Sequence, residues 1–170
     1  MKSTRFYFGR ALGLLCAVFF VSFGAISCSE DSETEYYAYD LQGTWVNQYE
    51  SYTIDYAGGT FDSGSSSYAG DNLVVKFTGS DSGYIYIKYT RASCETHSDY
   101  SSYIYTYDTD APDVGKWYAI AFKNLTNKSI SISGAFNSSG VTSTATLEEA
   151  ISTFTIDNGY FSFYSELAKK

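Results

Sequence analysis

The side chains best suited to chemistry in this sequence lie in one short stretch, Cys94-Glu95-Thr96-His97. A thiolate and an imidazole three residues apart could supply two ligands to zinc. A structural zinc site takes four such ligands, however, and the sequence holds only one histidine. We therefore interpret the stretch as a polar loop and predict no metal site.

Any catalytic triad in this chain would have to use His97, because it is the only histidine. Ser98 and Asp99 are its neighbours in sequence, which is not the geometry of a triad, and no nucleophile elbow surrounds them. No glycine loop of the phosphate-binding kind follows a strand-like segment. We predict no catalytic residues and no cofactor, so the chain is not expected to be an enzyme.

The first 27 residues have the pattern of a cleaved export signal. Lys2, Arg5 and Arg10 precede an apolar run over residues 11–26, which is shorter than the roughly 20 residues that a membrane-spanning helix needs. We predict a signal peptide over residues 1–27, removed by cleavage between Ser27 and Cys28.

The end of this run, Ala25-Ile26-Ser27-Cys28, resembles the lipobox of bacterial lipoproteins, although Ala25 stands where leucine is more usual. The resemblance implies that the Cys28 thiol takes diacylglycerol before cleavage and that acylated Cys28 then holds the protein in a lipid membrane. Two acyl chains already suffice for stable anchoring. The alternative is an ordinary signal peptide cut near Ser27, with an incidental cysteine.

Residues 28–40 are expected to form a tether between the lipid and the folded domain. Residues 29–35 are acidic and polar and show no apolar periodicity, so they offer nothing to bury. The stretch also resembles the acidic signal that directs some lipoproteins to the outer face of the bacterial outer membrane, which gives our predicted location. A plain solvated linker would have the same composition. Tyr36, Tyr37 and Tyr39, which follow it, are expected either to contact a partner or to plug the open end of the domain.

The charge of the mature chain excludes some partners. The chain has 11 basic and 19 acidic residues, and three of the basic ones lie in the signal, so 8 basic residues remain against 19 acidic ones, a net charge of −11. This sign argues against nucleic acid and against anionic lipid head groups as partners. Residues 41–170 have a length typical of one domain.

Apolar residues alternate with polar ones through most of this region, as expected for strands with one buried face. Glycine-, serine- and asparagine-rich connections at residues 79–83, 124–128 and 157–159 have the size of hairpin turns. The alternating faces are Leu73, Val75 and Phe77; Ile85, Ile87 and Tyr89; Tyr118, Ile120 and Phe122; Ile130 and Ile132; and Phe161 and Phe163.

One segment departs from this period, because Thr146-Leu147-Glu148-Glu149 matches a capping box and predicts a helix of about two turns. The pattern as a whole predicts an all-β domain of about eight or nine antiparallel strands with one short helix. So many short strands must hide their edges, and closure into an up-and-down β-barrel does so most completely. A β-sandwich is the alternative fold.

The residues Leu41-Gln42-Gly43-Thr44-Trp45 resemble the Gly-x-Trp signature that opens the first strand of lipocalins and related calycin barrels. The resemblance implies a lipocalin-like barrel over residues 41–170. It also implies that Trp45 closes one end of the barrel as a packing residue, and that Gly43 lets the chain enter closely. The other lipocalin motifs have no clear counterpart.

The densest aromatic cluster lies among serines and aspartates and contains Tyr100, Tyr103, Tyr105 and Tyr107. Tyrosine offers a large, stiff contact area with a polar tip, which suits recognition surfaces. These four residues are our candidate partner-binding residues, for a protein or a glycan. The alternative is that they pack within a strand.

Two functions remain open from the sequence. The first is surface recognition of a protein or glycan by a non-catalytic barrel; the second is a lipocalin-like carrier of a small apolar ligand. The bulky inner faces favour the first, because about eight strands enclose room only for such side chains or one small ligand. The sequence does not identify the ligand or the oligomeric state.

Overall fold

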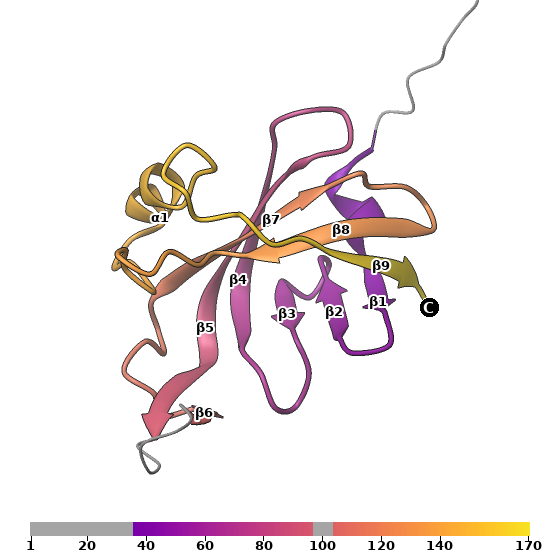
Figure 1. The fold of residues 1–170 in the computed structure, drawn as a ribbon. Helices are drawn as coiled ribbons and strands as arrows, with labels where there is room; N and C mark the ends of the chain where they lie inside the picture. The colour runs from indigo at the N-terminus through magenta and orange to yellow at the C-terminus, as the bar shows by residue number, and fades with distance from the viewer. Residues whose placement is uncertain (1–35, 97–103) are drawn as a thin grey trace, which may run out of the picture. The chain divides into compact units, whose positions relative to one another are not determined.

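The computed structural model describes residues 36–96 and 104–170. Within them are nine strands, one α-helix and a short 3-10 helix, shown in Figure 1. The chain runs in this order: the 3-10 helix Ala38–Leu41, β1 (Gly43–Val46), β2 (Ser51–Asp55), β3 (Thr60–Asp62), β4 (Ala69–Phe77), β5 (Gly83–Thr96), β6 (Ile104–Asp108), β7 (Trp117–Lys123), β8 (Ser129–Gly134), α1 (Leu147–Thr153) and β9 (Ser165–Lys169).

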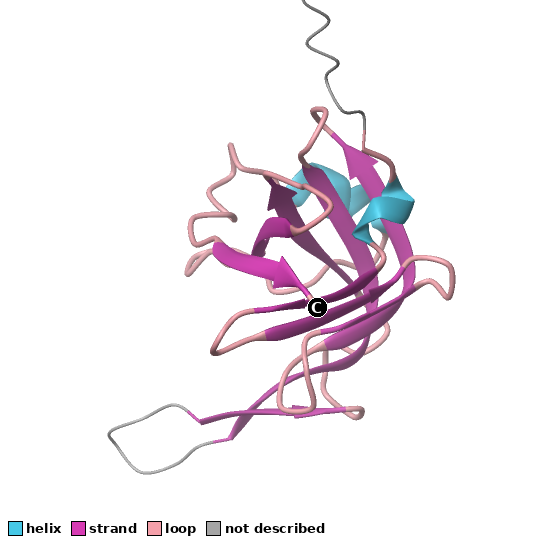
Figure 2. Cartoon of the chain, turned by 90° about the vertical axis from the view of Figure 1, so that its right-hand side faces the viewer, coloured by secondary structure: helices cyan, strands magenta, loops and turns pink. Residues whose placement is uncertain are grey.

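Eight of these strands form a closed antiparallel barrel. Going around it, the order is β1, β2, β3, β4, β5, β7, β8 and β9, and β9 pairs with β1 to complete the ring. Strand β6 stands outside the ring and pairs only with the second half of β5, so the two form a hairpin that projects from one end of the barrel (Figure 2). The predicted all-β up-and-down barrel is therefore confirmed, and the sandwich is not the fold.

The inner faces are those that the alternating pattern predicts. Ile85 on β5 pairs with Ile120 on β7, and Ile87 pairs with Tyr118. These four side chains are almost completely buried. The two inner residues of β8, Ile130 and Ile132, are buried as well.

The residues of the Gly-x-Trp signature pack together at one end of the barrel. The Trp45 ring is fully buried, and its Nε1 donates a hydrogen bond to the carbonyl oxygen of Leu41 in the 3-10 helix at 2.8 Å. Gly43 has a φ of +130°, a backbone conformation that residues with side chains rarely adopt, so the glycine is needed for the path of the chain into β1. We call this the closed end. Tyr37 and Tyr39 lie here and are exposed, so they do not plug the open end.

The helix forms where the capping box predicts. Thr146 accepts a hydrogen bond from the backbone of Glu149, whose carboxylate accepts from the backbone of Thr146. The helix contacts the outer side of β5 and β7. Tyr86 and Ala119, which point to this outer side, are as inaccessible as the inward residues. These two strands are therefore buried on both faces, which the alternation pattern did not predict.

The predicted strand at Phe161 and Phe163 is wrong. Residues 157–159 form a turn after α1 and not a hairpin, and the last strand begins only at Ser165. Phe161 packs on the outward ring of Tyr84 at 5.5 Å between ring centres, whereas Phe163 is 80% exposed. The alternation there reflects a segment lying over the outside of the barrel, with one side chain down and one up.

Candidate functional site

The other end of the barrel, the mouth, holds a pocket of about 750 Å³ that opens to solvent. Its walls come from the residues before β4, the β5–β6 hairpin, the turn before β7 and the segment after β8. The lining residues are Tyr68, Tyr89, Ser93, Cys94, Tyr107, Pro112, Asp113, Tyr118, Ala135, Phe136, Asn137, Val141 and Thr142. Aromatic rings and small polar groups thus line one opening.

Three tyrosines form the inner wall of this pocket. Tyr89 stacks on Tyr118 with ring centres 4.9 Å apart, and Tyr68 meets both rings edge-on at 6.2 Å and 5.2 Å. They come from three separate parts of the chain, and their mutual packing holds each ring in place. The wall is therefore preformed in the protein without a ligand.

A glycine on β8 makes room for the hydroxyl groups of this wall. A Cβ on Gly134 would lie 2.6 Å from Oη of Tyr118 and 3.4 Å from Oη of Tyr68. The Tyr118 hydroxyl donates a hydrogen bond to the backbone carbonyl of Ala135 at 3.1 Å. Gly134 is thus required by a close contact, not by its backbone conformation.

Burial changes the acidity of these tyrosines. Removal from solvent raises the pKa of Tyr68, Tyr89 and Tyr118 above the ordinary value, and neighbouring tyrosines raise all three further. Their hydroxyls are consequently neutral at physiological pH. They can give and take hydrogen bonds, but they are poor bases and poor nucleophiles.

Asp113 joins two walls of the pocket. Its Oδ2 accepts a hydrogen bond from the Thr142 hydroxyl at 2.6 Å, and its Oδ1 pairs with the Lys116 ammonium at 3.1 Å. Burial favours the neutral form, yet the hydrogen bonds from Thr142, Ser143 and Lys116 outweigh it and lower the pKa of the Asp113 carboxyl. The ionised carboxylate therefore ties the segment after β8 to the turn before β7.

Arg91 on β5 fixes the loop that carries Tyr68. Its guanidinium donates to the backbone carbonyls of Ser67 and Gly64 and forms an ion pair with Asp62 at 3.0 Å. A guanidinium has enough donors to hold several loop carbonyls at once. Arg91 is thus a positioning residue for the inner wall of the pocket.

Of the four candidate tyrosines, the structure brings Tyr107 to the pocket. Tyr107 lies on β6, is half-buried and lines the opening. Tyr105 pairs in register with Glu95, but its side chain, like the whole of Tyr100 and Tyr103, falls outside the described part of the chain. Ser27 and Cys28, at the predicted cleavage and lipidation site, fall outside it too.

The Cys-x-x-His stretch is only partly described. Cys94 is a half-buried free thiol on the pocket wall, whereas His97 lies in the undescribed residues 97–103. Among the residues that the structure describes, no three His, Cys, Asp or Glu side chains gather as they would around a metal ion.

Sequence reasoning assigned Tyr89 and Tyr118 to inner faces but did not recognise them as a site. It did not single out Tyr68, Asp113 or Gly134 at all. These residues become neighbours only in the folded barrel, which brings together positions as far apart in sequence as Tyr68 and Gly134, 66 positions. Only the unusual abundance of tyrosine, 18 residues, hinted at such a cluster.

The comparisons with known proteins give no relative. No family model, no curated protein and no solved structure matches this chain. In residues 36–96 and 104–170 there is also no helix of the length and apolar character required to cross a membrane.

Proposed function

We propose that this protein is a membrane-anchored bacterial lipoprotein whose barrel recognises, without catalysis, an uncharged ligand at its tyrosine-lined mouth. The observation that carries the proposal is the preformed pocket of about 750 Å³, whose inner wall is the stacked pair Tyr89 and Tyr118. A pocket that mixes apolar surface with a few fixed polar groups is typical of small-molecule sites.

The charges around the pocket favour a neutral ligand. Asp113 is the one ionisable carboxylate among the described lining residues, and none of them is a lysine or arginine. An anionic ligand, such as a fatty acid or a phosphate ester, would find no partner for its charge there. The strongly acidic composition of the chain opposes anions further.

The end of a glycan fits this chemistry best. A sugar ring presents an apolar face of C–H groups and an edge of hydroxyls, and the pocket offers aromatic rings beside the polar groups of Ser93, Asn137 and Thr142. Phe136 at the rim is 67% exposed and extends the aromatic surface beyond the pocket. A chain longer than the pocket could continue across it.

The second candidate is a carrier of a small apolar molecule. The pocket volume is sufficient for such a ligand. The space below it, however, is occupied by side chains that are almost fully buried, among them Ile54, Phe61 and Ile87. A long apolar chain would therefore have little depth to enter, which favours the glycan.

Titration of the purified mature protein with neutral oligosaccharides tests the proposal. The second candidate, a carrier of a small apolar molecule, is tested with two fluorescent probes: neutral N-phenylnaphthylamine and anionic anilinonaphthalene sulfonate. We expect the neutral compounds to bind and the anionic probe to bind weakly. Tyr107→Ser should weaken binding about tenfold, the loss typical of an aromatic contact residue.

The matched control is Tyr49→Ser, because Tyr49 is 85% exposed on the turn between β1 and β2 and does not line the pocket. It should bind as the unmodified protein does. Equal binding by the Tyr107→Ser protein, or tight binding of the anionic probe alone, would contradict the proposal.

A further inference from the structure

The polar groups that line the pocket differ in whether the protein already supplies their hydrogen-bond partners. On the wall formed by the turn before β7 and the segment after β8, the Thr142 hydroxyl donates to the Asp113 carboxylate. The Asn137 side chain is engaged at both of its polar atoms. Its Nδ2 donates to the carbonyl of Asn158, and its Oδ1 accepts from the backbone of Ser139, each at 3.0 Å. This wall is therefore held together by contacts within the protein.

The three wall tyrosines differ in the same way. The Tyr118 hydroxyl donates to the carbonyl of Ala135 at 3.1 Å, and the Tyr89 hydroxyl is hydrogen-bonded to the Tyr118 oxygen. The Tyr68 hydroxyl, by contrast, has no hydrogen-bond partner among residues 36–96 and 104–170. It is the hydroxyl of the inner wall that is left available to a ligand.

The Tyr68 hydroxyl faces the space that a ligand would occupy. In the part of the chain that the structure describes, no fully buried side-chain nitrogen or oxygen lacks a hydrogen-bond partner. A hydroxyl without such a partner must therefore reach solvent, and Tyr68 lines the pocket. Binding of a ligand there would displace this solvent and leave the hydroxyl dependent on the ligand for a partner.

The Tyr68 ring is held firmly from several sides. Phe61 stacks on it with ring centres 5.8 Å apart and planes 8° apart, and Tyr118 meets it edge-on. The Ser63 hydroxyl donates to the backbone carbonyl of Tyr68 at 2.6 Å. A group that is fixed before the ligand arrives loses little conformational freedom on binding. The position of the hydroxyl is thus set by the protein.

Two further hydroxyls of the pocket are available in the same sense. Ser93 on β5 and Tyr107 on β6 are partners in the ladder of the projecting hairpin, so their side chains lie on one face of it. Neither hydroxyl is hydrogen-bonded within the described residues. The oxygen groups that remain available to a ligand here, including that of Tyr68, are hydroxyls that can both donate and accept.

We propose that Tyr68 determines the specificity of the pocket, and that its hydroxyl selects ligands that place a hydroxyl group against it over apolar ligands of similar size. This inference rests on the proposed function and names the residue that distinguishes a glycan from an apolar molecule. A sugar hydroxyl can donate to the Tyr68 oxygen or accept from it. An apolar ligand would cover the Tyr68 hydroxyl and leave it unpaired, and sites with such a group discriminate strongly against ligands that cannot bond to it.

The test compares the unmodified mature protein with Tyr68→Phe, which keeps the ring and removes only the hydroxyl. Each protein is titrated with neutral hexasaccharides of glucose, xylose, mannose or galactose, and with N-phenylnaphthylamine as the apolar probe. We expect Tyr68→Phe to bind the preferred hexasaccharide about tenfold more weakly, the loss of one hydrogen bond. It should bind the apolar probe at least as tightly as before, so the ratio of the two affinities falls.

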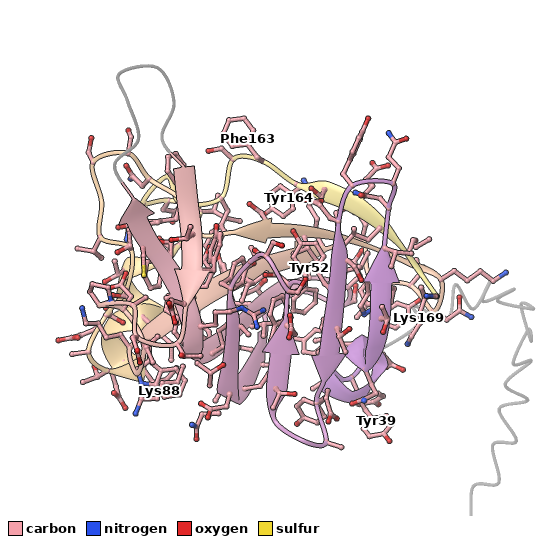
Figure 3. The ribbon with its side chains drawn as sticks, turned by 90° about the horizontal axis from the view of Figure 1, so that it is seen from below. Tyr39, Tyr52, Lys88, Phe163, Tyr164 and Lys169 are labelled. Carbon is pink, nitrogen blue, oxygen red and sulfur yellow. The ribbon has the colours of Figure 1, made fainter. Side chains whose placement is uncertain are left out.

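Two other changes of tyrosine to phenylalanine serve as controls. Tyr164 lies away from the pocket, on the segment that leads into β9, with the Lys123 ammonium 3.9 Å from the centre of its ring (Figure 3). Tyr164→Phe should leave the ratio of affinities unchanged. Tyr118→Phe removes the donor to the carbonyl of Ala135 and should lower the midpoint of denaturant unfolding. Tyr68→Phe should not lower it, because no bond within the described protein is lost.

The outcomes separate this inference from the proposed function. If the unmodified protein binds none of the hexasaccharides, the glycan proposal is wrong and the role of Tyr68 falls with it. If the unmodified protein binds a hexasaccharide but Tyr68→Phe keeps the same ratio of affinities, only the role of Tyr68 is wrong. The same holds if Tyr68→Phe weakens both ligands equally while its unfolding midpoint falls, since Tyr68 would then be a packing residue.

Discussion

Trp45 on β1 and Lys169 on β9 are partners across the seam that closes the barrel, and the Lys169 ammonium lies 4.8 Å from the centre of the Trp45 ring. The same ammonium donates a hydrogen bond to the backbone carbonyl of Asp40 at 3.2 Å. One side chain thus joins the last strand, the first strand and the 3-10 helix before it. A cation over an indole ring is worth about 0.5–2 kcal/mol, depending on its exposure.

Removing the ring at this seam should destabilise the whole domain. We expect Trp45→Ala to lower the free energy of unfolding by about 3–5 kcal/mol, because the ring is fully buried and leaves a cavity. Denaturant unfolding of the purified protein measures the change. A loss under about 1 kcal/mol, as for a surface substitution, would show that the ring does not close the barrel.

A methyl group at Gly134 should disturb the pocket from behind. We expect Gly134→Ala to cost about 1–3 kcal/mol and to weaken ligand binding, since the added Cβ would displace the hydroxyls of Tyr118 and Tyr68. Gly79→Ala is a useful comparison, because there the added Cβ meets the flexible hydroxyl of Ser82. Similar losses for both proteins would argue against a specific contact in the pocket.

Alkaline solution should unfold the domain through its buried tyrosines. Burial raises the pKa values of Tyr52, Tyr68, Tyr89 and Tyr118, so the folded protein resists their ionisation. The neutral tyrosines contribute fully to the free energy of unfolding below about pH 10, the ordinary pKa of tyrosine. This contribution is lost as the pH rises above that value, because the tyrosines of the unfolded chain ionise first. Ultraviolet titration should show a group of tyrosines that ionise only as the fold is lost. A single smooth titration near pH 10 with the fold intact would contradict this.

Acid should release the contact between Asp113 and Thr142. The pKa of the Asp113 carboxyl is lowered in the folded protein, so the ionised group stabilises the fold at neutral pH. This stabilisation is lost as the pH falls below about 4, the ordinary pKa, and through the lowered pKa of the folded state. We expect the stability of an Asp113→Asn protein to depend less on pH below this point. Unfolding curves collected from pH 7 to pH 3 make the comparison, and parallel profiles would count against the contact.

The predicted lipid anchor at Cys28 has a direct test in the cell. Cys28→Ser should abolish incorporation of a palmitate analogue and leave the protein either uncleaved or released from the membrane. Metabolic labelling followed by membrane fractionation measures both. A variant that still takes up label and sediments with membranes would refute the lipobox interpretation.

The sequence predicted the barrel well, because each strand contributes a local signal. Alternation at Ile85 and Ile87 depends only on whether a strand has one face toward the core, and the capping box at Thr146 is complete within four residues. The prediction was wrong at Phe161 and Phe163, since two-residue alternation also arises where an irregular segment lies on a surface. Period alone does not distinguish these cases.

The pocket could be predicted only in part. Tyr107 was a candidate because it lies in a visible cluster, but Tyr68 is an isolated tyrosine in a loop, positioned by hydrogen bonds from Arg91 to neighbouring carbonyls. Such a contact joins residues 24 and 27 positions apart and leaves no pattern in the sequence. The tyrosine wall is a property of the closed barrel.

The pairing of β1 with β9 also bears on when the protein can fold. Val46 and Ala168 are partners in this ladder, so the ring cannot be completed until the chain up to Lys169 is available. Closing so long a loop is slow, since its entropy must be lost before the seam forms. On the export route that we propose for this chain, the strands would therefore cross the membrane one after another without a finished barrel to obstruct them, and folding would be completed on the far side.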